Sequence, residues 1–356
     1  MLRLSTATST SDAMMKASEQ KPDRAVAIKR GLDFIYRFGS VSDNFEQYGS
    51  YLICCFALLG ATASDRKLRE LGRSQCHKLA RRWLRMHRTV PSDVAPDLLF
   101  DFILTRYALM RIGVKDQLLT DKLRLAAEKF SARELLSFDP LSEPPPEDVP
   151  FPCECGLKNR RGRKSCIKCR RRLQIQGRHR VWMEALANTY VAGRCGIRFG
   201  ARYADVLRWL PEIRPYPVGA DANEESFREA IYAATHVVYT LNDYGMYQLS
   251  SRWLALEFAF LKASVAPLCL SRDVELLGEV LDSLKTFGLQ ASHPLIKRGT
   301  NYLLTTQNSD GSWGDPDCDD VATRCHTTWT AIDALRECAY RGERLSFPEL
   351  RSLLRS

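Results

Sequence analysis

The 356-residue sequence lacks a long uninterrupted apolar run, although 45% of its residues are apolar. A helix that spans a bilayer needs about 18 or more consecutive apolar residues. The strongest candidates, Tyr51–Leu59 and Trp253–Ala263, are too short or carry charge at Glu257 and Lys262. We therefore expect no membrane span, and we predict that both segments are buried helices.

The N-terminus lacks the continuous apolar core and the small-residue cleavage site of a secretory signal. Residues 1–23 are rich in Ser, Thr and Ala and are predicted to be a flexible lead-in, while Asp12, Glu19 and Asp23 count against a transit peptide. The chain has 12 cysteines. Many cysteines in a chain without a secretory signal are typical of a protein in a reducing compartment. We expect a cytoplasmic protein.

Outside its cysteine-rich segment the sequence also lacks stretches in which apolar and polar residues alternate over the length of a β-strand. Apolar residues instead recur with the spacing of an α-helix, and Gly and Pro residues fall where such helices should stop. The predicted helical segments are 27–38, 48–61, 66–86, 97–113, 117–136, 180–193, 201–210, 225–241, 248–265, 272–286, 294–306, 326–340 and 346–355. These patterns predict an all-α fold class.

Two tight cysteine pairs stand out, Cys153 with Cys155 and Cys166 with Cys169, with ten residues between the pairs. Four thiolates satisfy tetrahedral Zn²⁺, and short gaps let backbone amides turn toward the sulfurs. The half-motif Cys-Gly-x-x-Asn, which ends at Asn159, resembles the first knuckle of many zinc ribbons. We predict a zinc ribbon with one structural zinc; the alternatives are unligated thiols or a disulfide pair.

The stretch from Lys158 to Arg180 lacks acidic residues and carries eleven basic ones. Its charge of +11 exceeds the +10 of the whole chain, so the basic character is local. Such a patch on 158–180 could contact nucleic acid, a nucleotide-bearing substrate or an acidic protein, or it could be a solvated charge run. No aromatic side chains are interleaved with the charges, which counts against base stacking.

The segment Pro140–Pro152 contains six prolines and three acids and is predicted to be a linker that leads into the zinc element. We therefore predict four parts: the flexible 1–23, a first helical half at 24–139, the linker and basic zinc element at 140–180, and a second helical half at 181–356. The zinc element is thus predicted to be an insertion between two helical halves.

One predicted helical pair carries a signature, in which Gln307 is followed by an Asp310–Gly311 turn and by Trp313. This Gln-x-x-x-Gly-x-Trp motif resembles the repeat of squalene and oxidosqualene cyclases and of the related protein prenyltransferase β subunits. The resemblance implies an α/α toroid of paired helices, in which the Gln and Trp tie adjacent hairpins together. The inner helix would begin near the pattern matched by Thr330–Leu335. The alternative is an open solenoid or irregular bundle.

The same resemblance suggests candidate site residues. Class II cyclases protonate their substrate with the middle Asp of Asp-x-Asp-Asp, which Asp319 matches, although here nine residues separate the motif from Thr330. Prenyltransferases and lanthionine cyclases place zinc on a Cys or an adjacent Cys-His near this helix start. Cys325 and His326 are therefore a candidate second metal site, although neither family's flanking residues are matched. The alternatives for Asp319 are a solvated acidic loop or a divalent-cation site.

A second polar set lies on one predicted helical face, because His236, Tyr239, Thr240 and Asp243 fall at i, i+3, i+4 and i+7. Inside a toroid this stripe would face the central cavity, whereas the alternative is an ordinary hydrogen-bonded core histidine. We predict that His236, Tyr239, Asp243, Asp319 and His326 are catalytic. His236, Asp243, Asp319 and His326 are expected to converge on one cavity.

These features lead to two functional hypotheses. The first is a terpene-cyclase-like or prenyltransferase-like toroid enzyme that acts on a hydrophobic small molecule or a peptide-linked substrate. It would use the predicted His and Asp residues, a structural zinc and a candidate second divalent metal. The alternative is a non-catalytic helical interaction protein whose basic zinc ribbon binds nucleic acid or an acidic partner. A polar, titratable centre favours the enzyme, and a filled apolar centre favours the interaction protein.

Overall fold

The computed structural model describes residues 23–217 and 224–354. Its elements in chain order are α1 (Arg24–Ser40), α2 (Ser42–Thr62), α3 (Arg66–Met86), α4 (Pro96–Arg111), α5 (Gln117–Ala127), α6 (Ala132–Leu136), β1 (Val149–Pro150), β2 (Ile175–Gln176), α7 (Arg178–Arg194), α8 (Tyr203–Leu207), α9 (Leu210–Ile213), α10 (Glu224–Leu241), α11 (Ala255–Ser271), α12 (Val274–Thr286), α13 (Pro294–Thr305), α14 (Val321–Leu335) and the 3₁₀ helix η2 (Pro348–Leu354). The predicted all-α fold class is confirmed. The predicted flexible segment 1–23 falls outside the described residues except for Asp23, which caps α1.

Three predicted helix boundaries are corrected. Helix α11 begins only at Ala255, because the preceding stretch is held by distant partners: the Gln248 amide donates to the Gly342 carbonyl at 2.9 Å. Helix α14 begins at Val321 and not at His326, because the Asp320 carboxylate accepts the Ala322 amide at 3.0 Å. The last predicted helix is a 3₁₀ helix.

Gly60 does not end a helix, since α2 continues to Thr62. Instead α2 and α3 pack backbone to backbone at Gly60 and Gly72. A Cβ added to Gly72 would lie 2.5 Å from the Gly60 nitrogen, which is closer than any real side chain allows. Glycine at this crossing therefore brings the first two long helices together.

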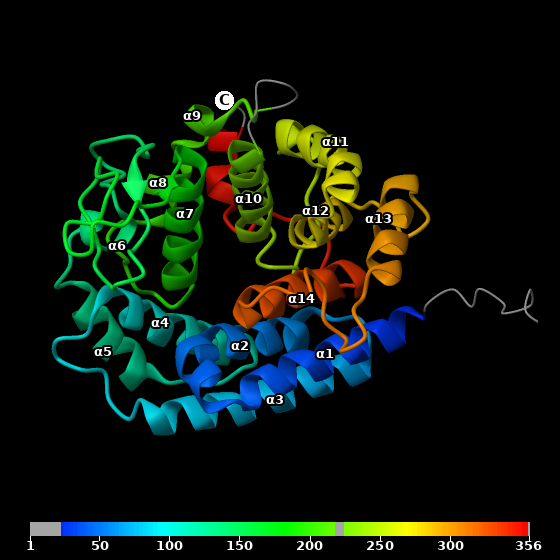
Figure 1. Cartoon of the computed structure of the whole chain (residues 1–356), viewed down its shortest axis with the longest axis horizontal. Coiled ribbons are helices and arrows are strands. Elements are labelled where there is room, and N and C mark those ends of the chain that lie inside the picture. Colours follow the sequence, from blue (N-terminus) through cyan, green and yellow to red (C-terminus); the bar gives the residue numbers. More distant parts are fainter. Residues whose placement is uncertain (1–22, 218–223, 355–356) are drawn as a thin grey trace, which may run out of the picture.

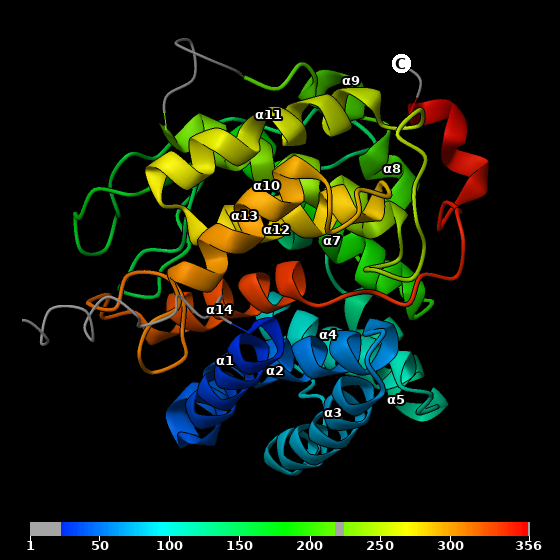
Figure 2. The same cartoon turned by 90° about the vertical axis from the view of Figure 1, so that its right-hand side faces the viewer.

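Six helices contact one another in a closed series. The order is α2, α4, α7, α10, α12 and α14, and α14 contacts α2 in turn. Against this series pack α1 and α3 on α2, α5 on α4, and α11 and α13 on α12. Figures 1 and 2 both place α14 between α1 and α2 on one side and α10 and α12 on the other. The first and last α-helices of the chain, α1 and α14, are therefore neighbours.

The Gln307 to Trp313 motif joins the C-terminal hairpin to α1. Nε2 of Gln307 donates to the Ala27 carbonyl at 2.9 Å and to the Gly311 carbonyl at 3.0 Å. The Trp313 indole is fully buried, and its Nε1 donates to the Leu303 carbonyl at 2.7 Å. These contacts tie α13 and the turn after it to the first helix of the chain.

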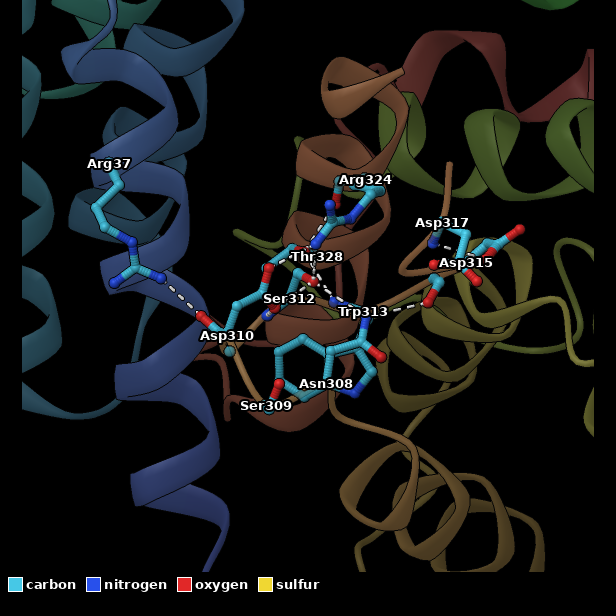
Figure 3. A network of polar contacts seen from close by, with 12 residues as sticks. Arg37, Asn308, Ser309, Asp310, Ser312, Trp313, Asp315, Asp317, Arg324 and Thr328 are labelled. Carbon is cyan, nitrogen blue, oxygen red and sulfur yellow. Dashed lines mark hydrogen bonds and ion pairs between the residues drawn. The ribbon is translucent and has the colours of Figure 1, made fainter. Parts of the chain in front are cut away.

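Polar contacts extend this junction along α1 and α14 (Figure 3). Arg37 of α1 donates to the Asp310 carbonyl at 2.6 Å, and Arg324 of α14 contacts the Asp310 carboxylate at 2.5 Å. Thr328 Oγ1 accepts the Trp313 amide at 3.1 Å. The turn that follows Gln307 is thus held from both sides.

Most buried apolar side chains form one core that runs from Ala27 to Leu354, whereas Cys153, Cys166 and Leu173 form a small core of their own.

Among the described residues, every helix is too short or too polar to span a membrane.

Candidate functional site

Four thiols gather at one point, as the cysteine spacing predicts. Cys153 Sγ lies 3.4 Å from Cys169 Sγ, and Cys155 Sγ lies 3.6 Å from Cys166 Sγ. All four sulfurs lie within 4.8 Å of one another, and no other set of three or more candidate metal ligands among the described residues is as close. A tetrahedral site with Zn–S bonds of about 2.3 Å separates its sulfurs by about 3.8 Å. The group could therefore hold a metal ion such as zinc.

Each cysteine pair lies in a tight backbone turn. The Gly156 amide donates to the Cys153 carbonyl at 2.7 Å, and the Arg170 amide donates to the Cys166 carbonyl at 3.0 Å. Both turns need a left-handed residue, and φ is 80° at Gly156 and 63° at Arg170. The backbone amide of Cys169 lowers the pKa of the Cys166 thiol to about 6, which favours the metal-binding thiolate.

The cysteine segment leaves and rejoins the helical body at one place. Strands β1 and β2 pair antiparallel, with Val149 opposite Gln176, and α7 begins directly after them at Arg178. The segment also has its own small core, which is formed by Cys153, Cys166 and Leu173.

A second group of titratable side chains lies where α10, α12 and α14 meet. Tyr232 and His236 come from α10, Glu275 and Glu279 from α12, and His326 from α14. We call these five residues the histidine–glutamate cluster. The cluster forms because α12 contacts both α10 and α14.

Glu279 lies at the centre of this cluster. Its Oε2 is 3.9 Å from His236 Nδ1, and its Oε1 is 3.9 Å from His326 Nε2. Thr235 Oγ1 donates to Oε2 at 2.6 Å, so Oε1 is the oxygen that faces His326. The side chain is 4% exposed, and burial raises its pKa to about 8. Glu279 therefore keeps its proton at neutral pH.

The two histidines of the cluster have different surroundings. His236 Nδ1 lies 2.9 Å from the Tyr232 carbonyl, and burial lowers the pKa of the imidazole to about 3, so it is neutral and Nδ1 donates. His326 is 48% exposed, and its Nε2 lies 3.4 Å from Glu275 Oε1. The Tyr232 hydroxyl also donates to the Glu275 carboxylate. His326 is thus the more exposed histidine of the cluster, and His236, with 19% of its side chain exposed, is the less exposed one.

Tyr239, also predicted as catalytic, lies against the cluster. Its ring centre is 5.6 Å from that of His236, and its hydroxyl donates to the backbone carbonyl of Glu279 at 3.1 Å. Burial raises the pKa of this hydroxyl well above its usual value. Tyr239 is therefore neutral and supports the helix that carries Glu279.

Asp243 does not join the cluster, because α10 ends at Leu241 and the predicted helical stripe ends with it. Asp243 has φ of 56° and lies in the turn that follows. Its Oδ1 contacts Arg111 Nη1 at 2.7 Å and accepts the Tyr190 hydroxyl, and its Oδ2 is 3.5 Å from Arg194 Nη2. Asp243 instead neutralises a buried arginine.

The structure also separates the candidates near the start of α14. Asp319 is exposed on the loop before the helix. Cys325 is buried in the main apolar core, and burial raises the pKa of its thiol to about 12. His326 faces the acids of α12. The Asp319 side chain and the Cys325 thiol therefore lie apart from the cluster that His326 joins.

The sequence analysis missed Glu275 and Glu279, the two acids of the cluster. A signal was present, because Glu275, Glu279 and Asp282 recur at i, i+4 and i+7 in an otherwise apolar helix. Acids at that spacing lie on one face of a helix, so they interrupt a face that packing alone would leave apolar.

We compared the chain with models of protein families, with curated proteins and with solved structures, and none of these comparisons gave a match.

Proposed function

We propose that this chain is an α/α toroid enzyme of the cyclase type, in which Glu279 protonates a hydrophobic substrate. The observation that carries the proposal is a buried carboxylic acid with a pKa raised to about 8, whose Oε1 faces the half-exposed His326. Such an acid is protonated at neutral pH and has a route to solvent. These are the two properties that a general acid needs.

The toroid part of the proposal rests on the helix contacts. An inner ring of α2, α4, α7, α10, α12 and α14 is supported by their closed series of contacts, with the other long helices outside. The bond from Gln307 to Ala27 then joins the last hairpin to the first, as the cyclase-type motif would.

The proposed chemistry is a redox-neutral isomerisation of an alkene. The Oε1–H bond of Glu279 breaks and its proton forms a C–H bond, which leaves a carbocation on the substrate. A different C–H proton then leaves to a solvent water molecule, which restores an alkene, and His326 passes a proton from solvent back to the Glu279 carboxylate.

Cyclase-type chemistry is favoured over the transferase type by the state of Cys325. A prenyltransferase-like site needs a metal-bound thiolate at this helix, whereas burial raises the pKa of the Cys325 thiol to about 12. Asp319, the position that matches the cyclase acid, is exposed on the loop before α14. Glu279 therefore takes the role that the sequence motif assigned to Asp319.

The cysteine segment is proposed as a structural zinc ribbon. All four ligand positions of a tetrahedral ion would be filled by Cys153, Cys155, Cys166 and Cys169, so no position remains for substrate. In this proposal the zinc folds the insertion and takes no part in the proton transfer.

The test is turnover in D₂O. Purified protein is incubated with squalene, oxidosqualene and a linear prenyl diphosphate, and products are analysed by mass spectrometry. We expect a cyclised isomer that carries one deuterium from solvent. Glu279→Gln should lower kcat by about 10²-fold or more, because it removes the proton donor.

The matched control is Glu70→Gln, which changes an exposed glutamate on α3 that pairs with Arg66. This variant should keep full activity. Cyclised product from the Glu279→Gln variant at the wild-type rate would contradict the assignment of the acid, and no isomeric product from any of the three substrates would contradict the cyclase proposal.

A further inference from the structure

The eleven basic side chains from Lys158 to Arg180 fall into two groups in the structure. Five of them contact an acid within 4.0 Å. The pairs are Lys158 with Asp97, Arg161 with Asp148, Arg171 with Glu154, Arg178 with Glu147, and Arg180 with Glu184. Three of these acids lie in the linker or on α4, so the pairs fix the cysteine segment against its neighbours.

The other six side chains have no acidic partner within 4.0 Å among the described residues, and all six residues are exposed. We call them the free cations; they are Arg160, Arg163, Lys164, Lys168, Arg170 and Arg172. No side-chain hydrogen bond to a described residue satisfies them either. Their charge is therefore available to an external anion.

Backbone pairing brings the free cations of two sequence runs together. The Leu173 amide donates to the Lys164 carbonyl at 3.0 Å, and Ser165 pairs with Arg172 in an antiparallel bridge. The loop that carries Arg160, Arg163 and Lys164 thus lies beside the turn that carries Arg170 and Arg172. The metal-binding thiols hold both runs in place.

We propose that the free cations bind the phosphate backbone of double-stranded nucleic acid. Regularly spaced phosphates are the anions that best match a fixed cluster of exposed cations. Four of the six are arginines, whose planar guanidinium groups bind phosphate oxygens in pairs. A duplex is favoured over a single strand because no aromatic side chain lies among them to stack on bases. Recognition would be independent of sequence.

The proposal does not depend on Glu279, because the free cations lie on the inserted segment and the histidine–glutamate cluster on α10, α12 and α14. Either proposal can fail while the other holds.

The test measures fluorescence anisotropy of a labelled 20-base-pair DNA duplex at several salt concentrations. One triple variant removes free cations, Arg163→Gln with Lys164→Gln and Lys168→Gln. The matched control removes three paired ones, Lys158→Gln with Arg161→Gln and Arg171→Gln. Both lose the same formal charge. We expect the first to weaken binding by at least about tenfold and to reduce the slope of log K against log salt by about 2–3, since each lost phosphate contact accounts for about 0.9.

The control variant should change affinity by less than about threefold, since the paired cations are already neutralised. Equal losses in the two variants would overturn the proposal, because net charge alone would then explain binding. Absence of binding by the wild type, or tighter binding to anionic lipid vesicles or to single-stranded DNA than to the duplex, would also overturn it. Metal content is measured for each variant. If the triple variant loses its metal, the single variants Arg163→Gln and Lys164→Gln carry the test.

Discussion

His236 on α10 and His326 on α14 lie on opposite sides of one carboxylate. Each has a ring nitrogen 3.9 Å from a different oxygen of Glu279. The His236 side chain is 19% exposed and is neutral because burial lowers its pKa to about 3, while the His326 side chain is 48% exposed. The arrangement places the acid between a less exposed and a more exposed histidine, which is the geometry on which the proposed proton transfer depends.

The raised pKa of Glu279 predicts a specific loss of stability at alkaline pH. The carboxyl has a pKa of about 8 in the folded protein and an ordinary value of 4.5, so unfolding releases its proton between those values and stability falls as pH rises. In the unfolded chain His236 still loses its proton near pH 6.5, but this contribution is the same in the wild type and in Glu279→Gln, so the difference between the two proteins isolates Glu279. Between pH 6.5 and pH 8 the wild type should lose about 2 kcal/mol more unfolding free energy than Glu279→Gln. Urea unfolding at both pH values measures this, and identical pH dependence in the two proteins would contradict the raised pKa.

Trp313→Ala should destabilise the fold by about 3–5 kcal/mol, because the indole is fully buried between α1, α13 and α14. Chemical denaturation followed by circular dichroism measures the loss. Trp253→Ala is the control, since Trp253 is only partly buried and its replacement should lower the free energy of unfolding by less. A loss below about 1 kcal/mol for Trp313→Ala would mean that the motif does not hold the two ends of the chain together.

Cys166→Ser should abolish metal binding and leave the helices folded. The cysteine segment has its own core, so the loss of its ion should unfold that segment alone. We expect about one zinc per wild-type chain and close to none in the variant, with little change in helical circular dichroism. Cys269→Ser on α11 is the control and should keep its metal. Unchanged zinc in Cys166→Ser, or cooperative unfolding of the whole chain on chelation, would refute this account.

Asp243→Asn should reduce stability and leave the turnover of folded protein unchanged. The Asp243 and Arg111 side chains are 5% and 6% exposed, so the variant leaves a buried guanidinium without its counter-charge, at a cost of about 3–5 kcal/mol. Glu70→Gln at the exposed Arg66 pair should cost less than about 1 kcal/mol. Denaturation and product formation are measured on the same samples. If the fully folded Asp243→Asn variant lost turnover, Asp243 would be a catalytic residue, as the sequence predicts.

The sequence predicts those elements whose stabilising contacts are local. The segment 66–86 is helical from Arg66 to Met86, because its apolar spacing is regular and the Asp65 carboxylate caps the Leu68 amide at 2.8 Å. The cysteine spacing likewise predicts the thiol cluster, since both turns are formed by neighbouring residues. In these two cases the local sequence pattern is sufficient to predict the structure.

Elements whose partners are distant in sequence are not predicted. The stretch from Gln248 to Leu249 has apolar spacing that suggests a helix, yet its amides bond to Gly342 and Thr286. Glu279 meets His236 and His326 only where α10, α12 and α14 come together, so the spacing of the acids on α12 marks a polar helical face but not the partners of that face. Asp243 was assigned to the wrong group because the end of α10 at Leu241 removes it from the helical face.

The most direct test of the central claim is the protonation state of Glu279 itself. Infrared spectra of protein labelled with ¹³C at the glutamate carboxyl are recorded from pH 5 to 10, and the Glu279→Gln spectra are subtracted. The account predicts a protonated carboxylic acid band that persists at pH 7 and disappears with a midpoint at about 8. A band that disappears near the ordinary pKa of 4.5 would contradict it, because an ionised Glu279 could not donate the proton at neutral pH.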